Sequence, residues 1–416
     1  MTRQSAWHLY QRLWLLLAIL LYLPFPALLL NNIIGTTLHP NHIWTDDAQL
    51  LPQAFFAMFW FSGMLLWRHF CAVHGLGQTA TPFLDQHVHV QLATSAPFHL
   101  TWLYPPLMGL LSLLYACLPL ALSFWVWRGL YLLIAAASLR RAGLGWAPIW
   151  LGLLGPASVI DFIEGENGTL TGGLAVSALL LMHSAPRTAG VLAACLGIKP
   201  QTALAFPFIL LRRRQWPALA ATIGFGLLLV LLTLPFFGIE GWRAFFLSSS
   251  PAASGLAATS LQQIFPVAGA TLLYMLRSFG VPLGLAGIAQ LAVFAGCAIA
   301  LWRLWARPGR PAIARMAASM SLGALMMPYG YLHDMVGFSL AMMAMAFQTS
   351  PARRPVYVGL WLFAGHSATL AALSGHILMP LAALIGALMA WREAAPQTPP
   401  HAHNPASAGP ALHPGA

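Results

Sequence analysis

The sequence predicts an all-α membrane protein that crosses the bilayer many times. Hydrophobic residues make up 59% of the 416 residues and charged residues only 7%, far below the charged share of about a quarter in soluble domains. Apolar runs of bilayer-spanning length, about 20 residues each, recur along the whole chain. Short arginine clusters separate these runs, as expected where basic residues set helix orientation. The net charge of +11 therefore reflects membrane topology, and we expect no nucleic-acid partner.

The N-terminal part predicts one span followed by a large outer loop. Arg3 precedes the first apolar run, 11–32, and Arg12 lies at its start. These two arginines favour a cytoplasmic N-terminus. The run lacks a small-residue cleavage site, which favours an uncleaved span over a signal peptide. The loop covers 33–104. The next apolar segment, 105–118, is too short to cross the membrane beyond its two prolines, so we expect a juxtamembrane helix on the outer face.

The later apolar runs alternate between arginine-rich ends and ends that carry acids. Placing the arginines inside gives ten spans, with both termini in the cytoplasm, in a single transmembrane domain, 1–392. Acids contribute little to orientation, yet eight of the nine fall on or near the outer side. We expect an interfacial helix at 261–278 and a disordered cytoplasmic tail at 393–416. The spans after the first are 119–139, 144–160, 168–184, 217–237, 280–302, 312–328, 335–349, 355–373 and 376–391.

The segment 188–211 predicts a re-entrant hairpin. Arginines flank both of its ends, so both ends favour the cytoplasm, and Pro200 breaks the helix near its middle. Non-helical backbone at membrane depth is tolerated where protein or water covers it. The only lysine of the chain, Lys199, lies at the tip. It is either a snorkelling side chain at the outer interface or a contact for a phosphate.

Three of the nine acids lie within six positions of one stretch, SVIDFIEGENGTLTGG at 158–173. Ionisable groups at membrane depth are costly and usually mark a functional site, although acids in loops are often merely solvated. His333, in PYGYLHDMVGF, either contacts a ligand or packs at the interface, and Tyr104 either stacks on a sugar or lipid or belongs to the aromatic belt. We expect one polar cavity lined by Asp161, Glu164, Glu166, Asp46, Asp47, Asp85, His333 and Asp334.

The cysteines predict neither a disulfide nor a metal site. All four are far apart, and no pair has the spacing of a metal motif. No DxD motif stands in the outer loops, so we expect no metal and no cofactor apart from the substrates. The cysteines are Cys71, Cys117, Cys195 and Cys297.

An ordered set of stretches resembles one known family. The stretches are FWFSG, WLYPPL, GENGTLTGGLAVSALLL, GIKPQTALAFPFILLRRRQW, GWRAFF and MPYGYLHDMV, spread over about residues 45 to 340. Together they resemble glycosyltransferase family 87, mannosyltransferase-like membrane enzymes of the GT-C class. The resemblance implies a GT-C-like helix bundle and transfer of a hexose, mannose in the first instance, from a polyprenyl-phosphate donor. It also implies a lipid or glycan acceptor at the extracytoplasmic face, and inversion with a carboxylate general base in the first outer loop.

The sequence departs from the family pattern at the position of that base. Phe55, in AFFAMFWFSGMLL, stands where similar proteins carry the acid, and phenylalanine cannot take up a proton. Asp46 and Asp47, in IWTDDAQLLPQ, are the nearest substitutes and are our candidate catalytic residues, with Asp85 next. The family's GQN-like turn reads GENG here and adds the carboxylate of Glu166. A member that has lost its catalysis remains an alternative.

Two other classes of function stay open at this point. A lipid-linked sugar flippase or solute carrier would need a polar path through the midplane, where Arg128 is the notable ionisable residue. A membrane scaffold would need no site. The uncleaved multi-pass pattern, without a retention signal, favours a bacterial inner membrane with the active site facing the periplasm. For the transferase, the candidate substrate-binding residues are Lys199, Glu166, Asn167, His333, Asp334, Tyr104 and Arg243.

Overall fold

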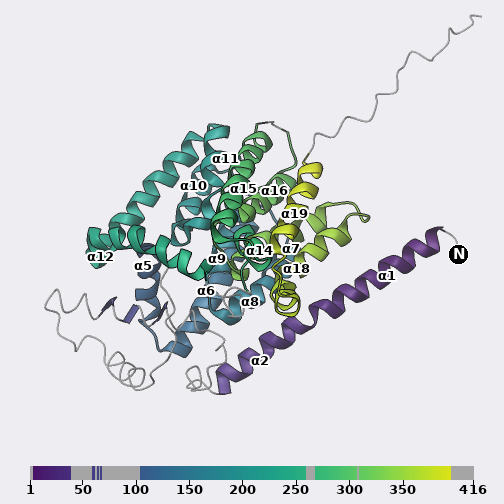
Figure 1. The fold of residues 1–416 in the computed structure, drawn as a ribbon, viewed down its shortest axis with the longest axis horizontal. Coiled ribbons are helices and arrows are strands. Elements are labelled where there is room, and N and C mark those ends of the chain that lie inside the picture. The colour runs from purple at the N-terminus through teal and green to yellow at the C-terminus, as the bar shows by residue number, and fades with distance from the viewer. Residues whose placement is uncertain are drawn as a thin grey trace, which may run out of the picture.

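The protein folds into a bundle of helices of unequal length, with α1 and α2 as a long arm along one side (Figure 1). The computed structural model describes residues 3–38, 59–60, 63–64, 66–67, 104–258, 268–306 and 309–394. Within these ranges the only β feature is an isolated bridge between Gly269 and Tyr331. The helices are α1 (Arg3–Tyr22), α2 (Pro24–Leu38), α5 (Pro106–Tyr115), α6 (Leu120–Arg141), α7 (Trp146–Leu153), α8 (Pro156–Glu164), α9 (Gly168–Leu181), α10 (Pro186–Cys195), η3 (Leu196–Ile198), η4 (Pro200–Ala203), α11 (Phe206–Arg213), α12 (Trp216–Ala258), α14 (Leu272–Ser278), α15 (Leu283–Leu304), α16 (Ala312–Met326), η5 (Leu332–Met335), α17 (Val336–Gln348), α18 (Arg354–Ser374) and α19 (Met379–Glu393).

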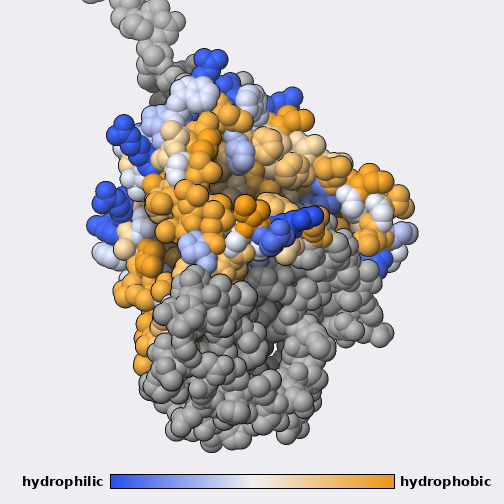
Figure 2. Space-filling view, turned by 90° about the vertical axis from the view of Figure 1, so that its left-hand side faces the viewer, coloured by the Kyte–Doolittle hydropathy of each residue, from blue (hydrophilic) through white to orange (hydrophobic). Residues whose placement is uncertain are grey.

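Several helices have the length and composition of membrane spans, which confirms a helical membrane protein. Figure 2 shows a broad apolar surface over the described residues of one face, bordered by hydrophilic side chains. Such a surface suits contact with lipid tails and would be costly in water. A bent pair, α7 with α8 at 49°, makes a sixth candidate if it is one span. The five single candidates are Tyr10–Asn31, Leu120–Arg141, Trp216–Leu247, Leu283–Leu304 and Arg354–Ser374.

The ten spans predicted from the sequence are not confirmed as a count. Helices α9, α16, α17 and α19 occupy four of the predicted positions, but they have only 13 to 15 residues. At 1.5 Å per residue they reach about 20 Å, which is less than the apolar core of about 30 Å. Three of them are short because each begins or ends beside one region of the bundle in which the chain is not regular helix. α9 and α17 begin there, and α16 ends just before it.

The core of the bundle lies where α9, α16 and α17 pack together. Thirteen of the fourteen residues of α9 are buried, and its first half is rich in glycine and threonine. Gly172 faces Gly337 of α17, and a Cβ atom added at Gly172 would lie 2.5 Å from the Gly337 nitrogen. The two backbones therefore touch, as small residues allow in membrane helix pairs. This contact brings the start of α9 against the start of α17.

The segment 188–211 breaks at the predicted position. Helix α10 leads into two short 3-10 helices, η3 and η4, and Lys199 lies between them with a non-helical backbone. Pro200 begins η4, and α11 follows. The break thus agrees with the predicted tip, while its depth in a membrane stays a prediction. Helix α5 covers most of the expected juxtamembrane segment, and α14 lies within the expected interfacial segment.

The segment between the predicted span 217–237 and the predicted interfacial helix is helical in its first part. Helix α12 continues to Ala258 and bends at Gly238, which has a positive φ of 58°. Glycine adopts this conformation without the strain that other residues suffer, so the helix restarts beyond the bend. The residues after the bend, including GWRAFF, are apolar enough to stay helical. Most of the first outer loop and of the C-terminal tail lie outside the described residues.

We predict that Gly172→Ala destabilises the protein, although alanine is the better helix former. The new methyl group would collide with the backbone of α17, and overpacking of this kind costs about 1–3 kcal/mol. Gly129→Ala on α6 is the matched control, because no atom lies within 4 Å of the added Cβ. It should leave stability unchanged or raise it by up to about 1 kcal/mol. Thermal unfolding in detergent measures both, and equal melting temperatures would contradict the close α9–α17 contact.

Candidate active site

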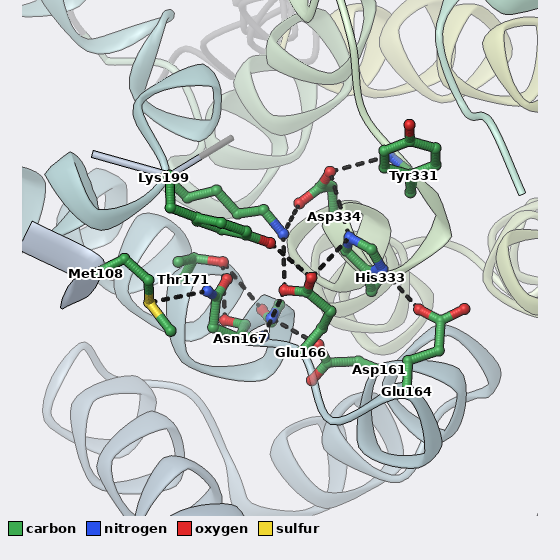
Figure 3. Close-up of polar contacts among 12 residues, drawn as sticks. Met108, Asp161, Glu164, Glu166, Asn167, Thr171, Lys199, Tyr331, His333 and Asp334 are labelled. Carbon is green, nitrogen blue, oxygen red and sulfur yellow. Dashed lines mark hydrogen bonds and ion pairs between the residues drawn. The ribbon is translucent and has the colours of Figure 1, made fainter. Parts of the chain in front are cut away.

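Ionisable side chains gather at one end of the bundle, where four segments leave regular helix (Figure 3). The segments are the α8–α9 junction, the η3–η4 junction, η5 and the residues just before α5. Their polar groups are almost fully enclosed, and buried charges of this kind require partners. The buried members are Asp161, Glu166, Asn167, Lys199, His333, Asp334 and Tyr104.

Asp161 shapes the α8–α9 junction. Its carboxylate accepts hydrogen bonds from the backbone nitrogens of Gly168, at 2.6 Å, and Thr169, at 2.9 Å, and from the Thr169 hydroxyl, at 2.6 Å. These donors lie at the N-terminus of α9, where a carboxylate satisfies free N–H groups and complements the helix dipole. Gly165 ends α8 in the left-handed conformation, with φ 77°. Asp161 therefore has a structural role.

Arg128 holds the same junction from the neighbouring helix α6. Its guanidinium donates to the backbone oxygen of Gly165, at 3.1 Å, and to that of Glu166. It also lies 3.9 Å from a carboxylate oxygen of Asp161. These carbonyls follow the end of α8, where cations are favoured. The side chain is buried and its donors serve the backbone, so it fixes the turn that carries Glu166.

Gly168 allows the junction to meet η5. A Cβ atom at Gly168 would lie 1.8 Å from the backbone oxygen of His333, so only glycine permits this approach. The contact places Glu164 and Glu166 on one side of His333 and Asp334. The isolated bridge holds η5 from its other side, with the Leu332 nitrogen donating to the Ala268 oxygen at 3.1 Å.

Lys199 joins two carboxylates in the centre of the cluster. Its Nζ lies 3.2 Å from Glu166 Oε2 and 2.7 Å from Asp334 Oδ1. Tyr104 donates its hydroxyl to Glu166 Oε1 at 2.6 Å. Burial alone would raise the pKa of Glu166, but Lys199, His333 and the Tyr104 hydrogen bond lower it to about 2. Burial lowers the pKa of Lys199, yet Asp334 and Glu166 more than offset this and raise it.

His333 connects this centre to a more accessible carboxylate. Its Nδ1 lies 2.6 Å from Glu164 Oε2, and its Nε2 lies 3.9 Å from Glu166 Oε1. Burial and Lys199 lower the pKa of His333, but Glu166, Asp334 and Glu164 raise it to about 9. The imidazole is therefore charged at neutral pH. The side chain of Glu164 is 28% exposed, whereas those of Glu166 and Asp334 are enclosed.

The cluster carries more negative than positive charge. Asp161, Glu164, Glu166 and Asp334 supply four carboxylates, while Arg128, Lys199 and protonated His333 supply three cations. The arrangement is suited to binding hydroxyl groups, for which carboxylates are strong acceptors. It is less suited to an unshielded phosphate, because both carboxylates on Lys199 would oppose it.

Asn167 offers a further polar atom to a ligand. It is buried at the N-cap of α9, and its Nδ2 lies 3.6 Å from the Met108 sulfur. Its Oδ1 has no hydrogen-bond partner among the described residues, which is costly for a buried amide.

A cavity of about 30 Å³ adjoins Asp334, next to Thr202 and Phe338, with room for about one water.

The structure brings together six of the seven predicted substrate-binding residues. Arg243 is the exception. It lies on α12 with its side chain 68% exposed and pairs loosely with Glu240 at 3.9 Å. Asp46 and Asp47, the predicted catalytic residues, lie outside the described residues, as do Asp85 and Phe55. The six that meet are Lys199, Glu166, Asn167, His333, Asp334 and Tyr104.

Sequence reasoning gave too little weight to Arg128 and Glu164. Arg128 was noted only as the basis for a transport pathway, but it is a support of the α8–α9 junction. The signal was its isolation in an apolar run, which required an acceptor nearby. Glu164 was expected among the outer acids but not among the substrate contacts. No local signal distinguishes it, because its partner His333 is distant in the chain.

Comparison with known families decides the identity of the chain. The family model of glycosyltransferase family 87 matches residues 102–328, more than half of the sequence. The chain belongs to glycosyltransferase family 87. Comparison with curated proteins and with solved structures gives no match.

Membership confirms the resemblance and makes the chain a membrane glycosyltransferase. The region matched to family 87 includes Glu166, Asn167 and Lys199, together with the α6 arginine that supports them. His333 and Asp334 follow its end by a few residues. The buried cluster is therefore the candidate active site of a family 87 transferase, and the roles of its residues are treated as proposals below.

We predict that Lys199→Met strongly destabilises the protein. Removing the ammonium leaves the Glu166 and Asp334 carboxylates buried against each other, and breaking a buried ion pair costs about 3–5 kcal/mol. Arg243→Met is the matched control, because its exposed ion pair is worth at most about 1 kcal/mol. Thermal unfolding in detergent measures both. If Lys199→Met melted with the control, the central ion pairs would not hold the fold together.

We predict that stability falls as the pH rises through 9. The pKa of His333 is about 9 in the folded protein, against about 6.5 when unfolded. Because the folded value is raised, the protonated form stabilises the fold fully below about pH 6.5, and this contribution is lost as the pH rises through 9. His333→Gln should flatten the melting-temperature profile between pH 6.5 and 9, while His366→Gln on α18 should retain it. A wild-type profile as flat as that of His333→Gln would show that His333 is neutral in the fold.

Proposed function

We propose that this glycosyltransferase moves a hexose, mannose in the first instance, from a polyprenyl-phosphate donor to a lipid or glycan acceptor. The observation that carries the proposal is the buried carboxylate–lysine–histidine network at the helix breaks of a family 87 chain. Such a network is too costly to serve packing alone. Its excess of carboxylates and the unpartnered Oδ1 of Asn167 are suited to sugar hydroxyls.

The reaction needs one carboxylate that stays ionised and reaches the acceptor hydroxyl. That carboxylate takes the hydroxyl proton as the acceptor oxygen bonds to the anomeric carbon. The bond from that carbon to the phosphate oxygen breaks, and its electron pair leaves with the polyprenyl phosphate. Attack from the side opposite the leaving group inverts the anomeric centre. Following the resemblance, we assign the base to Asp47 or Asp46. Within the described residues, Glu164 is the accessible carboxylate that supports an alternative assignment.

The network also limits how a phosphate can be bound. Lys199 is engaged by Glu166 and Asp334, so a donor phosphate has to compete with a carboxylate for it. Protonated His333 provides a second cation in the same cluster. We therefore propose that Lys199 and His333 together balance the charge of the leaving phosphate, without a metal or other cofactor. Arg243 is largely exposed and pairs with Glu240 on the same helix, α12, which does not support this role.

We propose that the cluster faces the periplasm of a bacterial inner membrane, with both termini in the cytoplasm. In this topology α9, α16, α17 and α19 complete ten crossings together with the longer helices. Helices α9 and α16 each run between the cluster and an end rich in arginine, which favours the cytoplasm. For a flippase, Arg128 would be needed along a polar path, but it donates to the backbone carbonyls of Gly165 and Glu166, which supports a structural role at the α8–α9 junction instead.

The test is transfer of radiolabelled mannose from polyprenyl-phosphate-mannose to endogenous lipids and glycans in membranes. We expect activity from the wild type and a loss of about 10²–10⁴-fold in the variant that lacks the base. The variants are Asp46→Ala/Asp47→Ala and Glu164→Gln, with Glu240→Gln as the exposed control. Loss of mannose transfer in only one of the variants Asp46→Ala/Asp47→Ala and Glu164→Gln identifies the base. Transfer from a nucleotide sugar but not from the lipid donor would overturn the proposal.

A further inference from the structure

A second group of charged side chains lies at the other end of α9 and α16. Arg212 and Arg213 end α11, and Arg315 lies in the first turn of α16. Arg315 is close enough to Arg213 and Arg310 for like-charge repulsion. The ring of His183, just after α9, lies 6.1 Å from that of Trp305 at the end of α15. Segments distant in the chain thus converge on one strongly positive region, which we call the arginine cluster.

Three arginines of this cluster, the half-buried Arg212 and Arg213 and the buried Arg315, have no counter-charge in the described part of the chain. Arg315 is only 5% exposed. Its Nε and those of Arg212 and Arg213 are enclosed and make no hydrogen bond to any described residue. The acid on the helix that packs against α16, Glu393 of α19, is already engaged by Arg353 at 3.0 Å and by Thr349 at 2.7 Å.

Tryptophans hold the guanidinium groups in place. The Arg315 guanidinium lies 4.3 Å from the centre of the Trp305 ring, and that of Arg212 lies 5.6 Å from the Trp302 ring. The Trp305 indole donates to Ser319 at 2.9 Å, and this serine donates to the Arg315 backbone oxygen at 2.8 Å. Stacking on an aromatic face stabilises an arginine but leaves its charge and in-plane donors available. The site is therefore built in advance of any ligand.

Topology alone does not explain this burial. Arginines that only orient helices can remain in water, as the exposed neighbours Arg214 and Arg303 do. Burying several guanidinium groups together is costly unless an anion compensates them. Planar guanidinium groups match a phosphate with paired hydrogen bonds. Tryptophans beside arginines at helix ends are typical of the membrane interface, where phospholipid phosphates lie.

We propose that the arginine cluster binds the phosphate of an anionic phospholipid headgroup, at the end of the bundle opposite the candidate active site. The half-buried Arg212 and Arg213 form the entrance, and Arg315 lies behind them against Trp305. Basic pockets between membrane helices suit anionic lipid headgroups. The proposal does not depend on the sugar transfer, because it uses none of the residues of the other end.

The test is lipid binding to the purified full-length protein in detergent. Native mass spectrometry would compare phosphatidylglycerol with phosphatidylcholine, and a thermal-shift arm would use inorganic phosphate alone. We expect phosphatidylglycerol to bind at least tenfold more tightly than phosphatidylcholine. Arg213→Gln/Arg315→Gln should weaken its binding at least tenfold, whereas Arg214→Gln/Arg303→Gln should stay within twofold of the wild type. Equal binding of both lipids, or an unchanged affinity in the first variant, would overturn the proposal.

A second measurement covers the case in which the first variant fails to fold. Wild-type protein would be photocrosslinked to a diazirine-tagged phosphatidylglycerol, and the labelled peptides would be mapped. We expect label on peptides that contain Arg212, Trp302 or Arg315. Label confined to other helix ends would overturn the proposal. Stabilisation by inorganic phosphate as strong as that by the lipid would overturn the lipid assignment and leave a free phosphate as the ligand.

Discussion

The buried ammonium of Lys199 lies between carboxylates that come from two separate helix breaks, and the rest of the architecture depends on this contact. Glu166 follows α8 and Asp334 belongs to η5, and the ammonium compensates the negative charge of both carboxylates in the interior. The helices must therefore end where these residues stand, which is why α9, α16 and α17 are shorter than a bilayer. Asp161 and Arg128 satisfy the backbone groups exposed by those breaks, so that the junction stays ordered around the charges.

The same arrangement gives the site its chemical character. Among the described residues of the cluster, carboxylates outnumber cations, and the accessible carboxylate of Glu164 is fixed by a charged histidine. A site of this kind favours neutral, hydroxyl-rich ligands. It would admit a phosphate only if Lys199 or His333 exchanged a contact with a carboxylate for a contact with the phosphate. Binding of a lipid-phosphate donor would thus be coupled to rearrangement of the ion pairs. At the other end of α9, Arg212, Arg213 and Arg315 have no carboxylate partner in the described part of the chain. The charge of that end is therefore positive, whereas the candidate active site carries excess negative charge.

Much of this was predictable from the sequence, for reasons that differ between residues. Composition and apolar runs established a helical membrane protein, and the single lysine beside Pro200 marked the break at the η3–η4 junction. The density of acids in SVIDFIEGENG pointed to the buried site. The individual ion pairs of Lys199 and Glu164 were not predictable, because they depend on the close contacts of Gly168 with η5 and of Gly172 with α17. Arg243 lies on the helical segment beyond the bend at Gly238 with its side chain exposed, and its role in substrate binding stays a prediction. The count of ten spans stays a prediction, because apolar length does not show where a buried site ends a helix.

The central claim is that the Lys199 network is where the sugar donor binds. The most direct measurement is an experimental structure of the protein with a non-transferable polyprenyl-phosphate-hexose analogue. The account predicts the hexose within hydrogen-bond distance of Asn167 or Glu164, and the phosphate within reach of Lys199 or His333, with at least one carboxylate displaced from the lysine. A donor bound elsewhere, with both Lys199 ion pairs intact, would contradict the account and leave the network with a purely structural role.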